Sequence, residues 1–360
     1  MVDEPTGDGV SADELTELPA GTPSDPGKRV TIYDVARVAG VAPSTVSRAF
    51  SRPGRVNAQT GQRIREIALK LGYHAHPVLR VEAGEATKVL LFVVADVANP
   101  VYSQIMQGFQ MEATANGYTA MLVDSQEDDV VERRTIENVL DLADGVILTS
   151  SRMSDSSINQ IAKVRPVVAV NRIVSTVPSI IPDTTQGMRL ILQNLHDHGH
   201  THVTYLAGPQ ASWADGMRWR GLVDNAAAFG MKIRRIGPNT PSPEGGAGAA
   251  TQWLSHRTSA VVAFNDLLAI GFMKAVALAG IRVPDDVSVI GVDNSIVTQI
   301  STPTLTSLAA STQAMGMQAA RVLIQLLRQR SRQHANHIVV PMRLVERHSV
   351  GAAAHPQKGQ

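Results

Sequence analysis

Apolar residues recur at helical spacing between residues 31 and 71. Thr31-Ile-Tyr-Asp34 resembles a capping box, and the apolar face that follows it stops at Gly40, a residue typical of helix ends. A tight turn then separates this face from the next one. The pattern predicts three short helices, over 31–39, from Pro43 to the Pro53-Gly54 break, and from about Asn57 to Leu71.

Beyond Lys88, continuous apolar runs alternate with amphipathic stretches. Such runs are typical of parallel strands covered on both faces, and repeated strand–helix units predict doubly wound sheets. The number of runs favours two lobes over one. The runs predicted as strands are 89–95, 119–123, 145–149, 167–170, 203–207, 260–264 and 287–292. The stretches predicted as helices are 101–116, 131–141, 185–198, 217–229 and 266–279.

These patterns predict an all-α helix-turn-helix head joined to an α/β body of two doubly wound parallel-sheet lobes. Ligands of such sheets bind beyond the carboxyl ends of the strands, so the cleft between the lobes is the expected pocket. The predicted boundaries are 1–27 for a disordered acidic tail, 28–74 for the head, 75–87 for a linker, 88–182 with 310–338 for the first lobe, 183–309 with 339–350 for the second, and 351–360 for a second disordered tail.

The net charge of +1 hides a strong segregation along the chain. Residues 1–27 carry seven acids and no Lys or Arg, whereas residues 28–80 carry ten bases against two acids, a net charge of +8. A compact basic block suits a polyanionic partner, although a solvated charged face would look the same by charge alone.

Several protein classes are disfavoured by what the sequence lacks. There is no cysteine, which excludes disulfides and thiolate zinc sites. We find no pattern of a signal peptide and no apolar run of about 18 residues, so we expect a cytoplasmic protein without a membrane span. We also find no phosphate-binding loop and no Gly-x-Ser-x-Gly elbow, so we expect neither an enzyme nor a cofactor.

Two further motifs are open to alternative interpretations. His196, His198, His200 and His202 alternate along the chain and could bind a metal. We favour a helix end and a strand start, because the break at Gly199 would scatter the four rings. Residues 245–248 are glycine-rich and are predicted to form a flexible loop.

The run from Val30 to Arg48, VTIYDVARVAGVAPSTVSR, closely resembles the head of lactose-repressor-type regulators, the LacI family. Val56, Thr60 and Leu71-Gly-Tyr73 extend the match. Body motifs then follow in family order: Asn99-Pro100, Asp144-Gly-Val-Ile-Leu148, Gly199-His200, Leu206-Ala-Gly-Pro209, Arg218 with Gly221, Phe264-Asn-Asp266, Val283 to Asp293, and Thr302 to Thr306. The resemblance covers about residues 29–350, and its motifs are specific only jointly.

The resemblance implies a homodimer in which each head reads half of a pseudo-palindromic DNA operator. Pro43, Ser44 and Arg48 match the positions that read bases. Because Pro43 offers no side-chain donor, we expect readout to depend on Ser44, Arg48 and Arg55. The remaining expected DNA contacts are Thr31, Tyr33, Thr45, Ser47, Asn57 and Thr60.

The resemblance also implies a periplasmic-binding-protein-like body that senses a small molecule. Its expected effector residues are Asn99, Asn171, Arg218, Asn265 and Asp293, whose chemistry suits the hydroxyl groups of a sugar or polyol. Other interpretations remain open: Asn265 could cap a helix, Asp293 could close a turn, and Arg218 could lie on a helix surface. Family members also bind purines and nucleosides, and Trp213 or Trp219 could stack on a sugar ring.

The segment 75–84 departs from the family pattern. Glu82 stands where the family has a leucine that wedges into the minor groove, and Pro77 falls within the expected hinge helix. Either Leu79 or Val81 takes the wedge role, or the protein bends its operator less.

The sequence therefore predicts a DNA-binding transcriptional repressor controlled by a small-molecule effector. A solute-binding protein of a sugar transport system would explain the body, but it would not explain the basic head. A nucleotide-binding enzyme would explain only the strand–helix units.

Overall fold

The computed structural model describes residues 30–51, 53–71, 73, 86–329 and 335–353, which divide into two compact units between Glu85 and Ala86. The predicted tail at 1–27 and the hinge positions Pro77, Leu79, Val81 and Glu82 lie outside the described residues.

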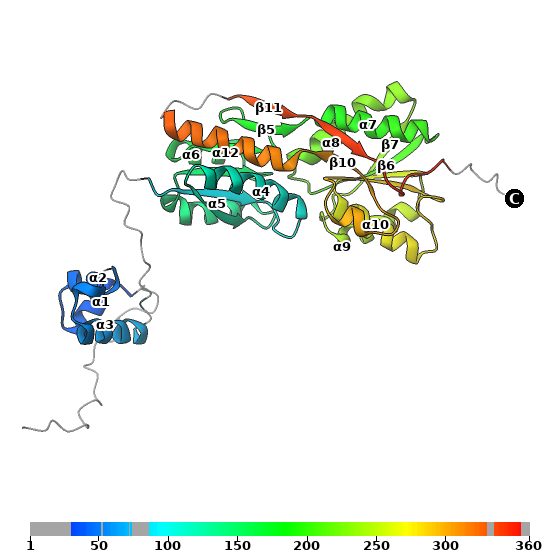
Figure 1. Cartoon of the computed structure of the whole chain (residues 1–360). Helices are drawn as coiled ribbons and strands as arrows, with labels where there is room; N and C mark the ends of the chain where they lie inside the picture. The colour runs from blue at the N-terminus through cyan, green and yellow to red at the C-terminus, as the bar shows by residue number, and fades with distance from the viewer. Residues whose placement is uncertain (1–29, 52, 72, 74–85, 330–334, 354–360) are drawn as a thin grey trace, which may run out of the picture. The chain divides into compact units, whose positions relative to one another are not determined.

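The first unit contains the three predicted helices, α1 (Ile32–Ala39), α2 (Pro43–Ser51) and α3 (Ala58–Lys70), with a 3₁₀ turn at Pro53–Arg55 (Figure 1). The Asp34 carboxylate begins α1 by accepting hydrogen bonds from the backbone nitrogen of Thr31 at 2.9 Å and from its hydroxyl at 2.7 Å. Gly40 ends the helix at φ +64°, a left-handed conformation that glycine adopts without strain. Val35, Val46 and Ile64 form the centre of a small core, so each helix contributes one apolar face.

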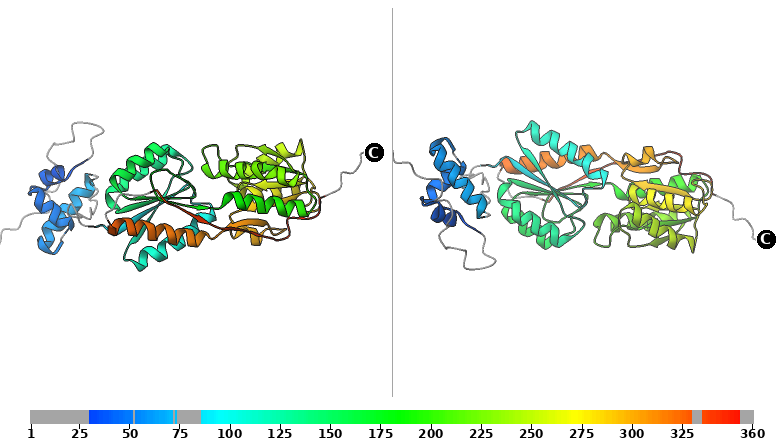
Figure 2. Two further views of the ribbon diagram at one scale, coloured as in Figure 1. Left: turned by 90° about the horizontal axis from the view of Figure 1, so that it is seen from above. Right: turned by 90° about the horizontal axis from the view of Figure 1, so that it is seen from below.

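The first lobe of the body is a six-stranded sheet in the order β11-β5-β4-β3-β1-β2, and every neighbouring pair is parallel. Helices α4 and α12 cover one face, and α5 and α6 cover the other (Figure 2). The elements are β1 (Val89–Val94), α4 (Pro100–Ala115), β2 (Thr119–Asp124), α5 (Asp129–Val139), β3 (Gly145–Thr149), α6 (Asp155–Val164), β4 (Val167–Val170), β5 (Ser179–Pro182), α12 (Thr312–Gln329) and β11 (His337–Val340), with a 3₁₀ turn at Leu140–Leu142.

The second lobe is a six-stranded sheet in the order β12-β10-β9-β8-β6-β7, parallel except for its edge strand β12. Its helices pack in pairs, α7 with α8 and α9 with α10 (Figure 1). The elements are α7 (Thr184–Asp197), β6 (His202–Leu206), α8 (Trp213–Ala226), β7 (Lys232–Ile236), α9 (Pro243–Leu254), β8 (Ala260–Ala263), α10 (Asp266–Leu278), β9 (Ser288–Val292), α11 (Val297–Ile300), β10 (Thr306–Ala310) and β12 (Met342–Val345), with a 3₁₀ turn at Ala227–Phe229.

The chain passes between the lobes three times, after β5, after β10 and after β11. The predicted fold class is therefore confirmed. Strand β11 continues to Val340, two residues beyond the boundary expected at 338. Neither lobe is continuous in sequence. In both sheets, most strands have their carboxyl ends on the side where the three connecting segments join the lobes.

The prediction of a flexible loop at residues 245–248 is wrong, because these residues belong to α9. The Ser242 hydroxyl caps this helix by accepting a hydrogen bond from the backbone nitrogen of Gly245 at 3.3 Å. A Cβ on Gly246 would lie 2.2 Å from the carbonyl oxygen of Leu268 in α10. Gly246 therefore serves close packing of α9 against α10, which a count of loop-forming residues does not reveal.

Candidate functional site

Helix α2 presents one polar face and one buried face. Pro43, Ser44 and Arg48 are exposed, whereas Val46 and Ala49 are buried in the core of the first unit. The side chains expected to read bases thus point away from that core. Thr45 and Ser47, on the same helix, are half-buried.

Arg55 and most of the remaining expected DNA contacts lie at the start of α1, on α3 and in the segment between α2 and α3. The Tyr33 side chain is 69% exposed, and Arg55 is exposed in the 3₁₀ turn. Asn57 is exposed, and its side-chain oxygen accepts a hydrogen bond from the backbone nitrogen of Gln59 at 3.0 Å, which caps α3. Thr31 is exposed and Thr60 is half-buried. The expected contact at Leu79 lies outside the described residues.

The body contains a cavity of about 640 Å³, a volume that includes the space at its mouth. Both lobes line it, and the first-lobe residues include Thr312 and Met315 at the start of α12. Four of the five expected effector residues line this cavity: Asn99, Asn171, Arg218 and Asp293.

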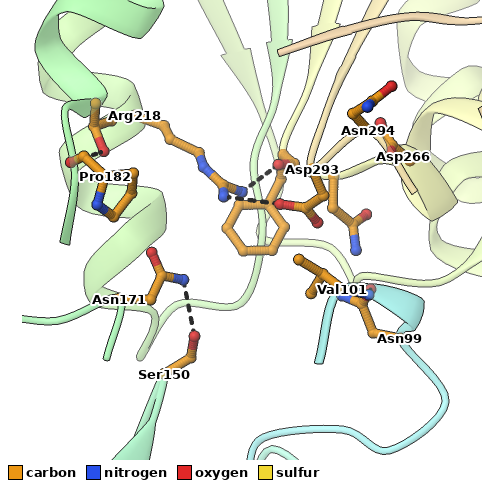
Figure 3. Close-up of polar contacts among 12 residues, drawn as sticks. Asn99, Val101, Ser150, Asn171, Pro182, Arg218, Asp266, Asp293 and Asn294 are labelled. Atoms are coloured by element: carbon orange, nitrogen blue, oxygen red, sulfur yellow. Dashed lines mark hydrogen bonds and ion pairs between the residues drawn. The ribbon is translucent and has the colours of Figure 1, made fainter. Parts of the chain in front are cut away.

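In the second lobe, Arg218 extends from α8 along the ring of Phe264, with its guanidinium carbon 4.5 Å from the ring centroid (Figure 3). One guanidinium nitrogen donates to the carbonyl oxygen of Phe264, and another lies 3.4 Å from Oδ1 of Asp293. Arg218 is 6% exposed, so the interpretation of a surface helix residue is excluded.

A second carboxylate, Asp266, lies next to Asp293. Its Oδ2 accepts hydrogen bonds from the backbone nitrogen and the hydroxyl of Ser295 at 2.7 and 2.8 Å, and its Oδ1 accepts one from the Ser307 hydroxyl at 2.6 Å. Burial, and then the charge of Asp293, raise the pKa of Asp266 to about 7. Burial also raises the pKa of Asp293 to about 6, against the opposing effect of the Arg218 charge.

In the first lobe, Asn171 and Ser150 follow two adjacent strands, β4 and β3. The Asn171 amide donates to the Ser150 hydroxyl at 2.9 Å (Figure 3). Asn99 precedes α4, and its side-chain oxygen accepts a hydrogen bond from the backbone nitrogen of Val101 at 3.2 Å. The same asparagine therefore begins a helix and faces the cavity.

Sequence reasoning missed an ion pair in the first lobe. Nε of Arg152 donates to Oε2 of Glu127 at 2.6 Å, and both residues line the cavity. Burial raises the pKa of Glu127, although the Arg152 charge opposes this shift. The only signal in the sequence was an arginine shortly after a predicted strand, and nothing in the pattern indicated its partner.

Asn265 differs from the other expected effector residues. It is 1% exposed and does not line the cavity. Its oxygen accepts a hydrogen bond from the backbone nitrogen of Leu268 at 2.9 Å, and its amide donates to the carbonyl oxygen of Pro241 at 3.2 Å. The structure thus shows the helix-capping role that the sequence left open.

The two tryptophans beside Arg218 do not line the cavity either. Trp219 stacks on Tyr205 and packs against the core of the second lobe.

The histidines of 196–202 have different surroundings. His200 is buried and contacts the hydroxyls of Ser259 and Ser288, whereas His198 contacts the carbonyl oxygen of Asn194. His198 and His200 therefore each bond to a different part of the second lobe.

Two family models match the chain, one within each of the two units. The model described as "Bacterial regulatory proteins, lacI family" matches residues 31–76, and the periplasmic binding protein-like domain matches residues 192–350. The chain belongs to the LacI family. It is therefore a DNA-binding transcriptional regulator and not an enzyme.

Curated LacI-family relatives match along most of this regulator. The transcriptional regulator DegA of Bacillus subtilis is 29% identical over 332 residues, which are 89% of this chain and 98% of DegA. The transcriptional repressor CytR of Escherichia coli is 28% identical over 302 residues, 82% of this chain and 89% of CytR.

Solved structures show the same fold. The complex of the regulator CelR with cellobiose has a TM-score of 0.67 at 26% identity, covering 89% of this chain and all of the CelR chain. The lac repressor dimer bound to operator and the anti-inducer ONPF has a TM-score of 0.67 at 24% identity, covering 90% and 100% of the two chains. In the described part of this regulator, none of the helices combines the length and apolar character that a membrane span requires.

Proposed function

We propose that this regulator is a repressor that binds a pseudo-palindromic operator as a homodimer, and that a neutral polyol such as a sugar controls its operator affinity. The repressor role is supported by the similarity to CytR, and dimeric operator binding by the fold shared with the lac repressor dimer. Ser44, Arg48 and Arg55 are the proposed base readers. Thr31, Tyr33, Thr45, Ser47, Asn57 and Thr60 are the proposed supporting contacts.

The observation that carries the effector proposal is the charge balance of the cavity. It contains two guanidinium groups, and each is paired with a carboxylate: Arg152 with Glu127 in the first lobe, and Arg218 with Asp293 in the second. A phosphorylated or carboxylated ligand would have to displace one of these carboxylates. Hydroxyl groups can donate to the carboxylates and accept from the guanidinium groups and amides without leaving any charge unpaired.

The two-lobed construction supplies the proposed link to DNA. Asn99 and Asn171 come from the first lobe, whereas Arg218 and Asp293 come from the second. A ligand that bonds to both lobes binds most tightly when they approach each other, and it therefore shifts the population toward that arrangement. Operator affinity changes if the two arrangements bind DNA differently.

A thermal-shift screen with neutral sugars, sugar phosphates and nucleosides tests this proposal. A ligand at 100 times its dissociation constant stabilises the protein by about 2.7 kcal/mol, a shift that is readily measured. We expect a neutral sugar to give the largest shift and to change the anisotropy of operator DNA titrated with the protein.

In the same assay, Arg218→Gln should weaken sugar binding by about 10–100-fold, because it removes charge-assisted hydrogen bonds. Arg133→Gln is the matched control, since Arg133 forms an exposed ion pair with Glu137 on α5. A shift that only anionic compounds produce, or an Arg218→Gln variant with unchanged affinity, would contradict the proposed effector class.

A further inference from the structure

The chain enters the body through a cluster of hydrogen bonds at the amino end of the first sheet. One carboxylate, that of Asp144, accepts three of them. Its Oδ1 receives the backbone nitrogen of Thr87 at 2.8 Å and the Thr87 hydroxyl at 2.9 Å, and its Oδ2 receives the backbone nitrogen of Lys88 at 2.9 Å. Thr87 and Lys88 are the second and third residues of the second unit, directly after the segment that leads from the DNA-binding unit.

Further contacts hold the same two residues. The Thr87 hydroxyl accepts a hydrogen bond from the backbone nitrogen of Val89 at 3.2 Å, and the carbonyl oxygen of Lys88 accepts one from Thr119 at 2.7 Å. Lys88 has φ +58°, a left-handed conformation that lysine rarely adopts, and its ammonium group lies 4.6 Å from the centroid of the Tyr118 ring. The entry point is therefore fixed in one strained conformation.

The hydrogen bonds of Asp144 to Thr87 and Lys88 lie at the opposite end of β3 from the cavity, so they do not help to form it. Asp144 directly precedes β3, at the amino end of the strand, whereas Ser150 and Arg152 line the cavity beyond its carboxyl end. The backbone nitrogen of Asp144 bonds to the carbonyl oxygen of Val89, so the loop before β3 and the start of β1 form one unit.

We infer that Asp144 is a positioning residue for operator binding. Its carboxylate fixes Thr87 and Lys88 and so determines where the segment leading from the DNA-binding unit becomes part of the body. Without these bonds, residues 86–88 are free to move, and operator binding must restrict additional backbone freedom in each chain. Asp144 thus acts on DNA binding through Thr87 and Lys88, without contacting DNA.

The test uses the full-length protein and a palindromic duplex selected from a random pool with the wild-type chain. No effector is required, so the result does not depend on the proposed effector class. We expect Asp144→Ala to weaken binding of this duplex about tenfold at a temperature well below unfolding. The slope of affinity against salt concentration should not change, because the phosphate contacts of the head are unaltered.

Asp286→Ala is the matched control. Asp286 also holds a loop with its carboxylate, accepting from the backbone nitrogen of Arg282 at 2.8 Å, but it lies in the second lobe. We expect it to lower the melting temperature to a similar degree and to leave duplex affinity unchanged. Thr87→Val is the milder variant, since it keeps both backbone bonds to Asp144, and it should weaken binding by a smaller factor. Wild-type affinity in both Asp144→Ala and Thr87→Val, or an equal loss in Asp286→Ala, would overturn the inference.

Discussion

Four residues that line the cavity have left-handed backbone conformations: Glu127 at φ +60°, Ser150 at φ +55°, Asn171 at φ +61° and Asp293 at φ +110°. Such conformations cost on the order of 1–3 kcal/mol each for residues other than glycine. Hydrogen bonds of these residues or of residues next to them hold these backbone conformations. Asn171 donates to Ser150, and the residues after Asp293 are bound through Ser295 to Asp266. The strain therefore occurs where side chains must point into the cavity.

The raised pKa of Asp293 predicts a pH dependence of ligand binding. Because that pKa is about 6, Asp293 is ionised at pH 7.5 and mostly protonated at pH 5. A protonated carboxyl loses one acceptor for the hydroxyl groups of a sugar, so we expect affinity to fall about tenfold between these pH values. Titration calorimetry at several pH values, with the best sugar from the screen, measures this change.

The Asp293→Asn variant separates this effect from unfolding. It should bind the sugar more weakly than wild type. The part of the pH dependence of affinity that is due to Asp293 should disappear. The pKa of this carboxyl is higher in the folded state than its ordinary value of 3.8, so its protonation stabilises the fold as the pH falls from 7 to 5. Constant wild-type affinity over this range would contradict the assignment.

At the scale of elements, α4 and α12 pack unusually closely because glycine stands at their crossing. A Cβ on Gly108 would lie 1.9 Å from the carbonyl oxygen of Gln313, and one on Gly316 would lie 1.9 Å from that of Ile105. Polar contacts continue along the pair, with Arg321 of α12 bonded to Glu112 of α4 at 2.9 Å. The two helices thus form one body that reaches the cavity at Thr312.

We expect Gly316→Ala to destabilise the body, because the added methyl group meets backbone that cannot rotate away. Overpacking of this kind costs about 1–3 kcal/mol, which lowers the melting temperature by several degrees in a domain of this size. Circular dichroism during heating measures the change.

Gly248→Ala is the matched control for this substitution. Gly248 is exposed on α9, and an added Cβ would have no atom within 4 Å. The higher helix propensity of alanine should leave stability unchanged or raise it by up to about 1 kcal/mol. Equal destabilisation by both substitutions would show that the helix crossing is not the cause.

At the scale of the whole molecule, the opposed charges of residues 1–27 and 28–80 have a consequence for DNA binding. The seven acids precede a block with a net charge of +8. We expect them to lower the positive potential that attracts DNA of any sequence. On this hypothesis, specific contacts supply a larger share of operator affinity, which improves discrimination between operator and other DNA.

Replacing the seven acids with Asn and Gln should therefore increase affinity for random-sequence DNA more than affinity for operator DNA. The difference should shrink as salt rises from 50 to 300 mM, because salt screens charge at about 10 Å or less. Anisotropy titrations with both duplexes measure it. A control that replaces uncharged residues of the same segment, such as Ser11 and Thr16, should have no effect.

The sequence alone determined the elements with strong local signals. Apolar residues at helical spacing, with a helix end at Gly40 and a helix start at Pro43, predicted the helices of the head. Continuous apolar runs predicted the central strands of both sheets. Strands β5, β7, β10, β11 and β12 escaped prediction because polar residues or proline interrupt or flank their apolar runs, and three of them lie at sheet edges, where polar residues are tolerated. Local patterns carry little information about such strands.

The tertiary structure alone decided which side chains meet. Family resemblance suggested Arg218 and Asp293, but only the fold places Glu127 beside Arg152 and bonds the Asn265 amide to Pro241, away from the cavity. It also showed that Gly245–Gly248 lies in a helix and that Asp144 holds Thr87, a residue 57 positions earlier. The physical reason is the same in each case: these roles depend on contacts between segments distant in sequence, whereas periodicity and capping motifs report only on neighbours along the chain.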